Sequence, residues 1–284
     1  MLLRNRYSVL FLFLVWAVPA AAQQPRVNLS ATPEIGGAPN QPRIGSGSRT
    51  LPDNSTYSGE YLNGKFHGKG KLVQAYGYTY TGDFEDGFFH GQGELILANG
   101  DRYVGEFVRG NVHGQAEFIG RDGETYKGDF INGYYHGTGV LATSYGDLHK
   151  GRFKNGHLSG PGSVVFRDGS KLHGVFENGL LNGKGKMTKF DGSVYEGDFV
   201  DSRPEGNGRI TYANGIVYAG TFVKGVMYGP GTLYSNGQEI RGNFINGEPV
   251  GEVRLKSQDG VEYVGQIQKW QFTGNPVGNQ TTRR

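Results

Sequence analysis

Residues 126–139 read YKGDFINGYYHGTG, and this stretch decides the fold. It opens with an aromatic residue, Tyr126, followed by a glycine two positions later and by Phe130 two positions beyond that. The dipeptide Asn132-Gly133 comes next, and it favours a two-residue hairpin turn because both of its residues adopt positive φ readily. The stretch is therefore predicted to form two short strands joined by a tight turn.

The same pattern recurs along the chain with a period of 23 residues, apart from one 22-residue step. Each of the ten units has an opening residue (position 0), a glycine at position 2, an apolar residue at position 4 and another glycine at position 11. The units open at Tyr57, Tyr80, Tyr103, Tyr126, His149, Leu172, Tyr195, Tyr218, Ile240 and Tyr263. Such a period indicates a stacked array in which no unit folds alone.

The turn dipeptide also predicts how the strands pair. With a two-residue turn, position 4 lies opposite position 9, position 2 opposite position 11, and position 0 opposite position 13, which is usually glycine. One face is then aromatic and aliphatic, and the other carries the acidic residues Glu60, Asp83, Glu106 and Asp129. The loop between successive units must have an odd number of residues, because only then does the apolar face stay on the same side of the sheet. Ala98-Asn99-Gly100 suits a three-residue loop with glycine at its last position. The 22-residue step, at Asn236-Gly237, suits a two-residue loop instead.

Composition agrees with many short strands and excludes several other classes. Glycine accounts for 50 of 284 residues but does not recur at every third position, which excludes collagen. The 17 Tyr and 17 Phe are too many for a disordered chain, and the absence of cysteine excludes disulfide and zinc–thiolate frameworks. The 29 basic and 26 acidic residues nearly balance, so no nucleic-acid partner is expected.

The N-terminal segment has the pattern of a bacterial-type signal peptide, predicted over residues 1–22. Arg4 and Arg6 precede an apolar run, and Ala20-Ala21-Ala22 provides the small residues of a cleavage site. An uncleaved anchor is the alternative, but the apolar run is shorter than the roughly 20 residues that span a bilayer. The protein is therefore expected to be exported, to the periplasm or outside the cell. Residues 23–54 are predicted to be a disordered linker, 55–276 the repeat array and 277–284 a tail.

The units resemble the MORN repeat, whose pattern is visible in Tyr126-Lys127-Gly128, Asn132-Gly133 and His136-Gly137-Thr138-Gly139. The resemblance implies an all-β fold, an elongated single-layer antiparallel sheet of about ten stacked β-hairpins. It also implies roles in protein association or membrane positioning. Units five and six depart from the pattern, with His149 and Leu172 in place of tyrosine and with Ser159 and Asn182 in place of the turn histidine.

Two repeated sets of side chains could carry chemistry. His67, His90, His113 and His136 form a column at position 10, but equivalent side chains of successive hairpins lie about 10 Å apart and no second ligand type recurs beside them. The acidic column has the regularity of a solvated surface, whereas a glycosidase needs two carboxylates at one defined spot. We therefore expect no catalytic residues, no metal site, no cofactor and no enzymatic activity.

Two surfaces remain as candidates for binding. The opening tyrosines either form the protein's own thin core or line an exposed groove for a peptide, glycan or lipid; they are Tyr57, Tyr80, Tyr103, Tyr126, Tyr195, Tyr218 and Tyr263. The second candidate is a basic stripe in the middle of the array, which either reflects sequence drift or docks an anionic partner. It consists of Lys150, Arg152, Lys154, Lys171 and His173.

These observations favour a non-catalytic scaffold that binds another protein in the cell envelope or outside the cell. The alternative is a peripheral module that binds membrane lipid or cell-wall glycan.

Overall fold

The computed structural model describes residues 44–75 and 77–277, and the predicted signal peptide lies outside this range. The described residues form two structural units, 44–167 and 168–277, and each structural unit contains several of the 23-residue repeats, which are hairpins. The first contains β1 (Ile44–Thr50), β2 (Thr56–Leu62), β3 (Lys65–Val73), β4 (Thr79–Glu85), β5 (Phe88–Ile96), β6 (Arg102–Val108), β7 (Asn111–Ile119), β8 (Thr125–Ile131), β9 (Tyr134–Ala142), β10 (Leu148–Lys154) and β11 (His157–Val165). The second contains β12 (Lys171–Glu177), β13 (Leu180–Thr188), β14 (Val194–Val200), β15 (Arg203–Thr211), β16 (Val217–Val223), β17 (Val226–Ser235), β18 (Gln238–Ile245), β19 (Glu248–Lys256), β20 (Glu262–Gln268) and β21 (Gln271–Pro276).

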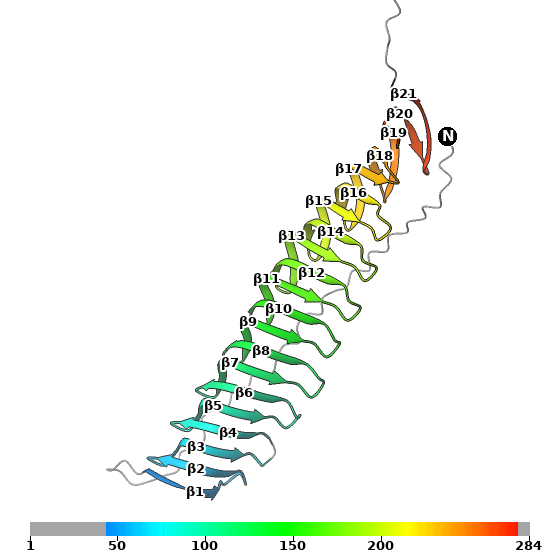
Figure 1. The fold of residues 1–284 in the computed structure, drawn as a ribbon. Coiled ribbons are helices and arrows are strands. Elements are labelled where there is room, and N and C mark those ends of the chain that lie inside the picture. The colour runs from blue at the N-terminus through cyan, green and yellow to red at the C-terminus, as the bar shows by residue number, and fades with distance from the viewer. Residues whose placement is uncertain (1–43, 76, 278–284) are drawn as a thin grey trace, which may run out of the picture. The chain divides into compact units, whose positions relative to one another are not determined.

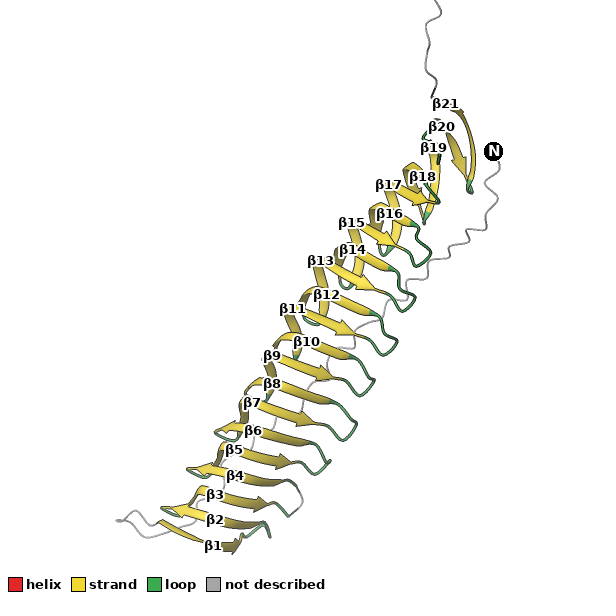
Figure 2. Ribbon diagram, viewed as in Figure 1, coloured by secondary structure: helices red, strands yellow, loops and turns green. Residues whose placement is uncertain are grey.

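Within each unit the strands follow one another in sequence order as an open antiparallel sheet (Figure 1). The described residues contain strands, turns and loops but no helix (Figure 2). The predicted all-β fold of stacked hairpins is therefore confirmed.

Both predicted loop types are confirmed. Asn63 and Gly64 have φ of 52° and 80°, the left-handed conformation that a two-residue primed turn requires. Between hairpins, Leu97 N–H donates to the Asp101 carbonyl at 2.8 Å, which closes a three-residue loop that ends on Gly100 with φ of 95°. The 22-residue step has the predicted two-residue turn, with φ of 49° at Asn236 and 74° at Gly237.

The predicted register is correct near the turn and wrong further from it. Tyr61 lies opposite Phe66 as expected, but Gly59 lies opposite Gly70 rather than Gly68, and Tyr57 opposite Leu72 rather than Gly70. A bulge after His67 inserts two unpaired residues, and it recurs in hairpins along the chain. Because the number of inserted residues is even, each residue still points to the face of the sheet that was predicted for it.

The predicted linker also needs correction. Residues 44–50 form β1, which pairs with β2 from Ile44–Leu62 to Thr50–Thr56, and Leu51 and Ser55 in the following turn are buried. The ordered sheet therefore begins before residue 55; residues 23–43 of the predicted linker and 278–284 of the predicted tail lie outside the described residues.

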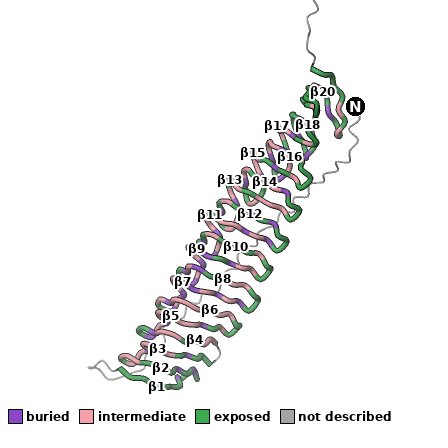
Figure 3. The backbone as a smooth tube through the Cα atoms, viewed as in Figure 1, coloured by how far each residue is buried: buried purple, intermediate pink, exposed green. Residues whose placement is uncertain are grey.

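The core is a column of aromatic rings on the inner face of each unit, and the buried positions recur at the same points of successive hairpins (Figure 3). The Tyr80 ring stacks on Phe89 of its own hairpin, with centroids 3.7 Å apart, and meets Phe107 of the next hairpin edge-on at 5.1 Å. The ring lies against Gly93 and Gly82, which face each other across β4 and β5. Each hairpin thus completes the core of its neighbour.

The hairpin β6–β7 shows what happens when one of these glycines is replaced. Ala116 occupies position 13 opposite Gly105, and position 9 is Val112 rather than an aromatic residue. The ring of Tyr103 contacts Phe118 at 4.9 Å, and its hydroxyl has no hydrogen-bond partner. The glycine at position 13 is therefore needed for the usual placement of the tyrosine.

Hydrogen bonds at both hairpin ends also join successive hairpins. At the turn, Gly87 N–H donates to the Phe66 carbonyl at 2.9 Å. At the loops, Arg121 N–H donates to Asp101 Oδ1 at 2.9 Å, and Phe190 N–H donates to Ser170 Oγ at 3.1 Å. Asp101 and Ser170, each at the end of one loop, thus accept a hydrogen bond from the backbone of the next loop.

Gly139→Ala should lower the stability of the repeat sheet by about 1–3 kcal/mol, the usual cost of overpacking a filled core. The new Cβ would lie 2.5 Å from Tyr126 Cζ, and the ring would have to leave its place as Tyr103 does. The control is Gly47→Ala, because a Cβ there meets nothing within 4 Å. Urea or thermal melting measures the effect, and equal loss in both variants would contradict the proposed role of Gly139.

Candidate functional site

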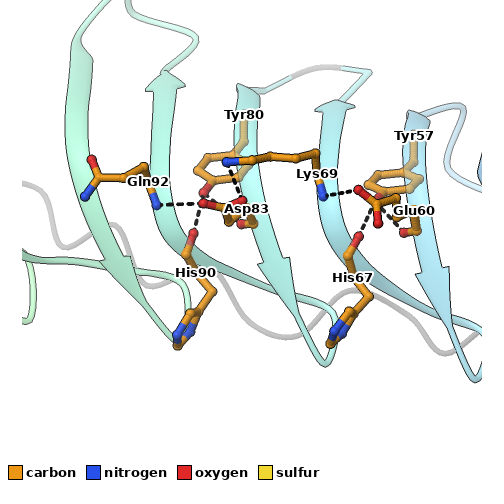
Figure 4. A network of polar contacts seen from close by, with 8 residues as sticks. All are labelled: Tyr57, Glu60, His67, Lys69, Tyr80, Asp83, His90 and Gln92. Atoms are coloured by element: carbon orange, nitrogen blue, oxygen red, sulfur yellow. Dashed lines mark hydrogen bonds and ion pairs between the residues drawn. The ribbon is translucent and has the colours of Figure 1, made fainter.

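The repeated acidic residues hold the backbone of the bulge (Figure 4). Glu60 Oε1 accepts a hydrogen bond from Lys69 N–H at 2.9 Å, and Asp83 Oδ2 accepts one from Gln92 N–H at 3.0 Å. In each case the donor is one of the two inserted residues, which have no paired residue on the facing strand of their own hairpin, so the acidic side chain takes the place of a backbone acceptor. The acidic column is therefore a structural element and not merely a solvated surface.

The tyrosine hydroxyls satisfy the carbonyl groups of the same bulge. Tyr80 Oη donates to the carbonyl oxygens of Asp83 and His90, at 2.9 and 3.1 Å, and Tyr126 does the same with Asp129 and His136, at 3.1 and 3.0 Å. Burial raises the pKa of both tyrosines, so that each keeps the proton it donates. The tyrosine ring, its hydroxyl and the acidic side chain thus all stabilise the backbone of the bulge.

An ion pair extends this network to the next hairpin. Lys69 Nζ lies 2.6 Å from Asp83 Oδ1, so the bulge residue of one hairpin binds the acid of the following one (Figure 4). In the second unit Lys184 makes the same contact with Asp198 at 2.8 Å. Both lysines are largely exposed, so each pair contributes on the order of 1 kcal/mol or less.

The histidine column is distributed along the sheet as expected from the repeat. His90 Nδ1 lies 3.1 Å from Glu85 Oε2, whereas the Nδ1 atoms of His67 and His136 are buried without a partner. Among the described residues, no group of three or more histidine, aspartate or glutamate side chains is arranged to hold a metal ion. The prediction that the chain lacks a metal site remains a prediction.

The hypothesis of an exposed tyrosine groove is wrong. Six of the seven opening tyrosines are at most 1% exposed, and Tyr263 near the end of the second unit is half-buried. The ring faces contact neighbouring aromatic rings and glycine backbone. The six buried tyrosines form the core and offer no surface to a ligand.

The predicted basic stripe is divided between the two units. Lys150, Arg152 and Lys154 are exposed on β10 of the first unit, while Lys171 and His173 are exposed on β12 of the second. None of the five forms an ion pair within the described residues, and the β10 group alone forms a defined cluster. Arg152 replaces the bulge acid, so a carboxylate at this position is not required for the hairpin to form.

His149 replaces the core tyrosine in the same hairpin. It is 5% exposed, lies between Leu141 and Val164, and its Nε2 atom has no hydrogen-bond partner. Burial lowers the pKa of His149, and the neighbouring Asp147 carboxylate opposes this effect only in part. Leu158 fills the space against Gly151 and Gly162 that an aromatic ring occupies elsewhere.

Tyr126→Phe should destabilise the sheet by about 1–3 kcal/mol, because two part-buried carbonyls lose the hydroxyl donor that they share. The matched control is Tyr103→Phe, which removes a buried hydroxyl that has no partner and should leave stability unchanged or slightly higher. Equal losses of unfolding free energy in the two variants would show that the hydroxyl bonds do not stabilise the bulge.

Stability should also fall below about pH 6.5, because the unfolded chain then protonates His149 while the folded chain, with its lowered pKa, does not. One such proton contributes at most about 1.4 kcal/mol per pH unit. His149→Leu, which reproduces Leu172 of the next repeat, should flatten the pH dependence of the unfolding midpoint between pH 7 and 5. His157→Leu, a half-buried site in the same hairpin, is the control; an unchanged slope in His149→Leu would exclude the effect.

The part of the chain that the structure describes contains no helix long and apolar enough to cross a membrane.

Comparison with solved structures finds weak similarity. The TCP10 domain of Danio rerio CPAP matches with 12% identity over 82% of this chain and 99% of that chain, at a TM-score of 0.33. The same domain in complex with a peptide of Danio rerio STIL matches with 17% identity, 80% and 97% coverage and a TM-score of 0.24. The Drosophila melanogaster SAS-4 TCP domain in complex with a proline-rich motif of Ana2 matches with 11% identity, 82% and 97% coverage and a TM-score of 0.23. Sequence identities and TM-scores this low support no conclusion about function.

No curated protein matches the sequence. The family model described as MORN repeat matches eight segments between residues 57 and 239: 57–75, 80–102, 103–125, 126–143, 149–171, 173–194, 195–217 and 218–239. The hairpins β18–β19 and β20–β21 continue the same architecture beyond the last match. With matches over more than half of its length and the predicted hairpins in place, the chain belongs to the MORN repeat family.

Proposed function

We propose that this protein is an exported, non-catalytic scaffold that binds another protein through the outer faces of its repeat sheets. The observation that carries the proposal is the exposed basic cluster of Lys150, Arg152 and Lys154 on β10, which forms no ion pair within the described residues. Uncompensated charges on one strand offer a docking site for an anionic protein surface.

The structural roles of the other repeated polar residues support a scaffold over an enzyme. Carboxylates such as Glu60 and Asp83 are engaged by backbone N–H groups, and the tyrosine hydroxyls by backbone carbonyls. The repeated side chains that could have supplied acid–base chemistry therefore stabilise the fold. What varies among hairpins is the outer face, where a binding partner would find its specificity.

Export follows from the pattern of residues 1–22 and is part of the proposal. Processing can be tested by N-terminal sequencing of the mature protein, which should begin at Gln23. A chain that retains residues 1–22 would contradict the exported location but leave the scaffold role open to its own test.

Binding through the β10 cluster predicts that Lys150→Glu, Arg152→Glu and Lys154→Glu together weaken capture of the protein partner without lowering the melting temperature. The effect should be largest at low salt and fade above roughly 0.15 M, where the screening length is about 8 Å. The matched control is Lys71→Glu, Arg121→Glu and Arg167→Glu, which changes the charge of the same unit equally at exposed positions.

Capture is measured from an envelope fraction at two salt concentrations, alongside co-sedimentation with anionic vesicles and with peptidoglycan. Equal capture by the two triple variants at low salt would contradict docking at β10. Direct binding to vesicles or peptidoglycan that needs no other protein would favour the lipid or glycan module instead.

A further inference from the structure

The outer face of the hairpin β16–β17 differs from that of every other described hairpin. Side chains that alternate with the buried core residues point to this face, and on β16 and β17 none of them is charged. They are Val217, Ala219, Thr221, Val223, Val226, Tyr228, Pro230, Thr232 and Tyr234. Each other hairpin in residues 56–75 and 77–276 carries at least one aspartate, glutamate, lysine or arginine on the corresponding face.

Two tyrosines on this face are exposed, whereas six of the seven opening tyrosines are buried in the core. Tyr228 is 47% exposed and Tyr234 39%. Tyr228 takes the place of the histidine column, and its neighbour across the strands is Ile245, since Gly229 pairs with Phe244; Ile245 is 46% exposed. Val223, at 39%, extends the apolar area on the other side. The β16–β18 face thus has several adjacent exposed apolar groups that no described segment covers.

Arginines flank the charge-free outer face of β16 and β17 on both sides. The residues of one row are direct cross-strand partners in the order Arg209, Ala219, Thr232, Arg241 and Arg254. Arg241 pairs with Glu239 at 2.7 Å, whereas Arg209 and Arg254 form no ion pair within the described residues. Glu196, opposite Arg209, is engaged by Lys186 at 2.8 Å. Arg254 therefore lies beside Arg241, whose charge is offset by Glu239, and has no carboxylate partner of its own within the described residues.

A charge-depleted centre with exposed tyrosine, surrounded by a rim with arginine, is the composition of a protein–protein interface. We infer that the outer face of β15–β19 is a docking surface for a protein whose contact area is apolar at its centre and carries carboxylates at its edge. This inference rests on the proposed scaffold function and places a docking surface in the second unit, separate from the β10 cluster. Tyr228 and Tyr234 would be buried at the centre, and Arg209 and Arg254 would meet the partner's carboxylates.

Site-specific photo-crosslinking in cells that make the full chain tests the inference. A benzophenone side chain is placed at residue 228 or 234, and at Ile96 or Ile131 as control positions, because these are 40% and 42% exposed on other hairpins. A third probe at residue 150 reports on the β10 cluster. We expect the same polypeptide to be crosslinked from 228 and 234 and not from 96 or 131.

The crosslinked protein is then purified and titrated against the full chain. Tyr228→Ser with Tyr234→Ser should weaken its Kd at least about tenfold, whereas Ile96→Ser with Ile131→Ser should not. Arg209→Glu with Arg254→Glu should weaken binding most at low salt. Unaltered melting temperatures would show that each pair acts on binding alone.

Four outcomes would overturn the docking surface. Adducts from residue 150 without adducts from 228 and 234 would remove it while leaving the proposed scaffold function in place. Adducts to lipid or glycan at 228 and 234, or a Kd unchanged by the tyrosine substitutions, would also remove it. The absence of protein adducts from all three sites would overturn both proposals.

Discussion

The fold depends on the contact between a tyrosine ring and bare glycine backbone. In the hairpin β4–β5, Gly82 and Gly93 face each other, and the Tyr80 ring lies where any side chain at either position would stand. From there its hydroxyl reaches two carbonyls at the bulge and its edge meets the phenylalanine of the next hairpin. A single contact therefore stabilises both the bend within one hairpin and the packing between two.

This constraint explains which departures from the repeat are tolerated. Ala116 forces Tyr103 into a different environment but leaves the strands paired, because Phe118 and Phe130 still cover the ring. At His149 and Leu172 the glycines remain while leucine at position 9 fills the vacated space. The hairpin thus requires a filled inner face more strictly than it requires tyrosine.

The outer face is therefore where the proposed binding function would lie. The inner face is filled by rings, and the bulge acids and hydroxyls are committed to backbone groups, so only outer-face side chains can change without cost to the fold. Two departures from the average outer face stand out by charge: the uncompensated cations of β10 and the charge-free tyrosine face of β16–β17. A linear array can present such different surfaces because each hairpin is stabilised mainly by its neighbours.

The sequence by itself determined the hairpins, their turn types and the face to which each residue belongs. Asn-Gly turns and a period-two alternation are local signals, and the parity of the loops between hairpins follows by counting. The sequence did not reveal the bulge, because an insertion of two residues leaves the alternation of side chains between the two faces unchanged. Only the tertiary structure therefore showed that Tyr57 opposes Leu72, that Glu60 binds Lys69 N–H, and that the tyrosine column is buried. Burial of those rings depends on the bend that the bulge produces and on the next hairpin beside it, and neither is encoded within one repeat.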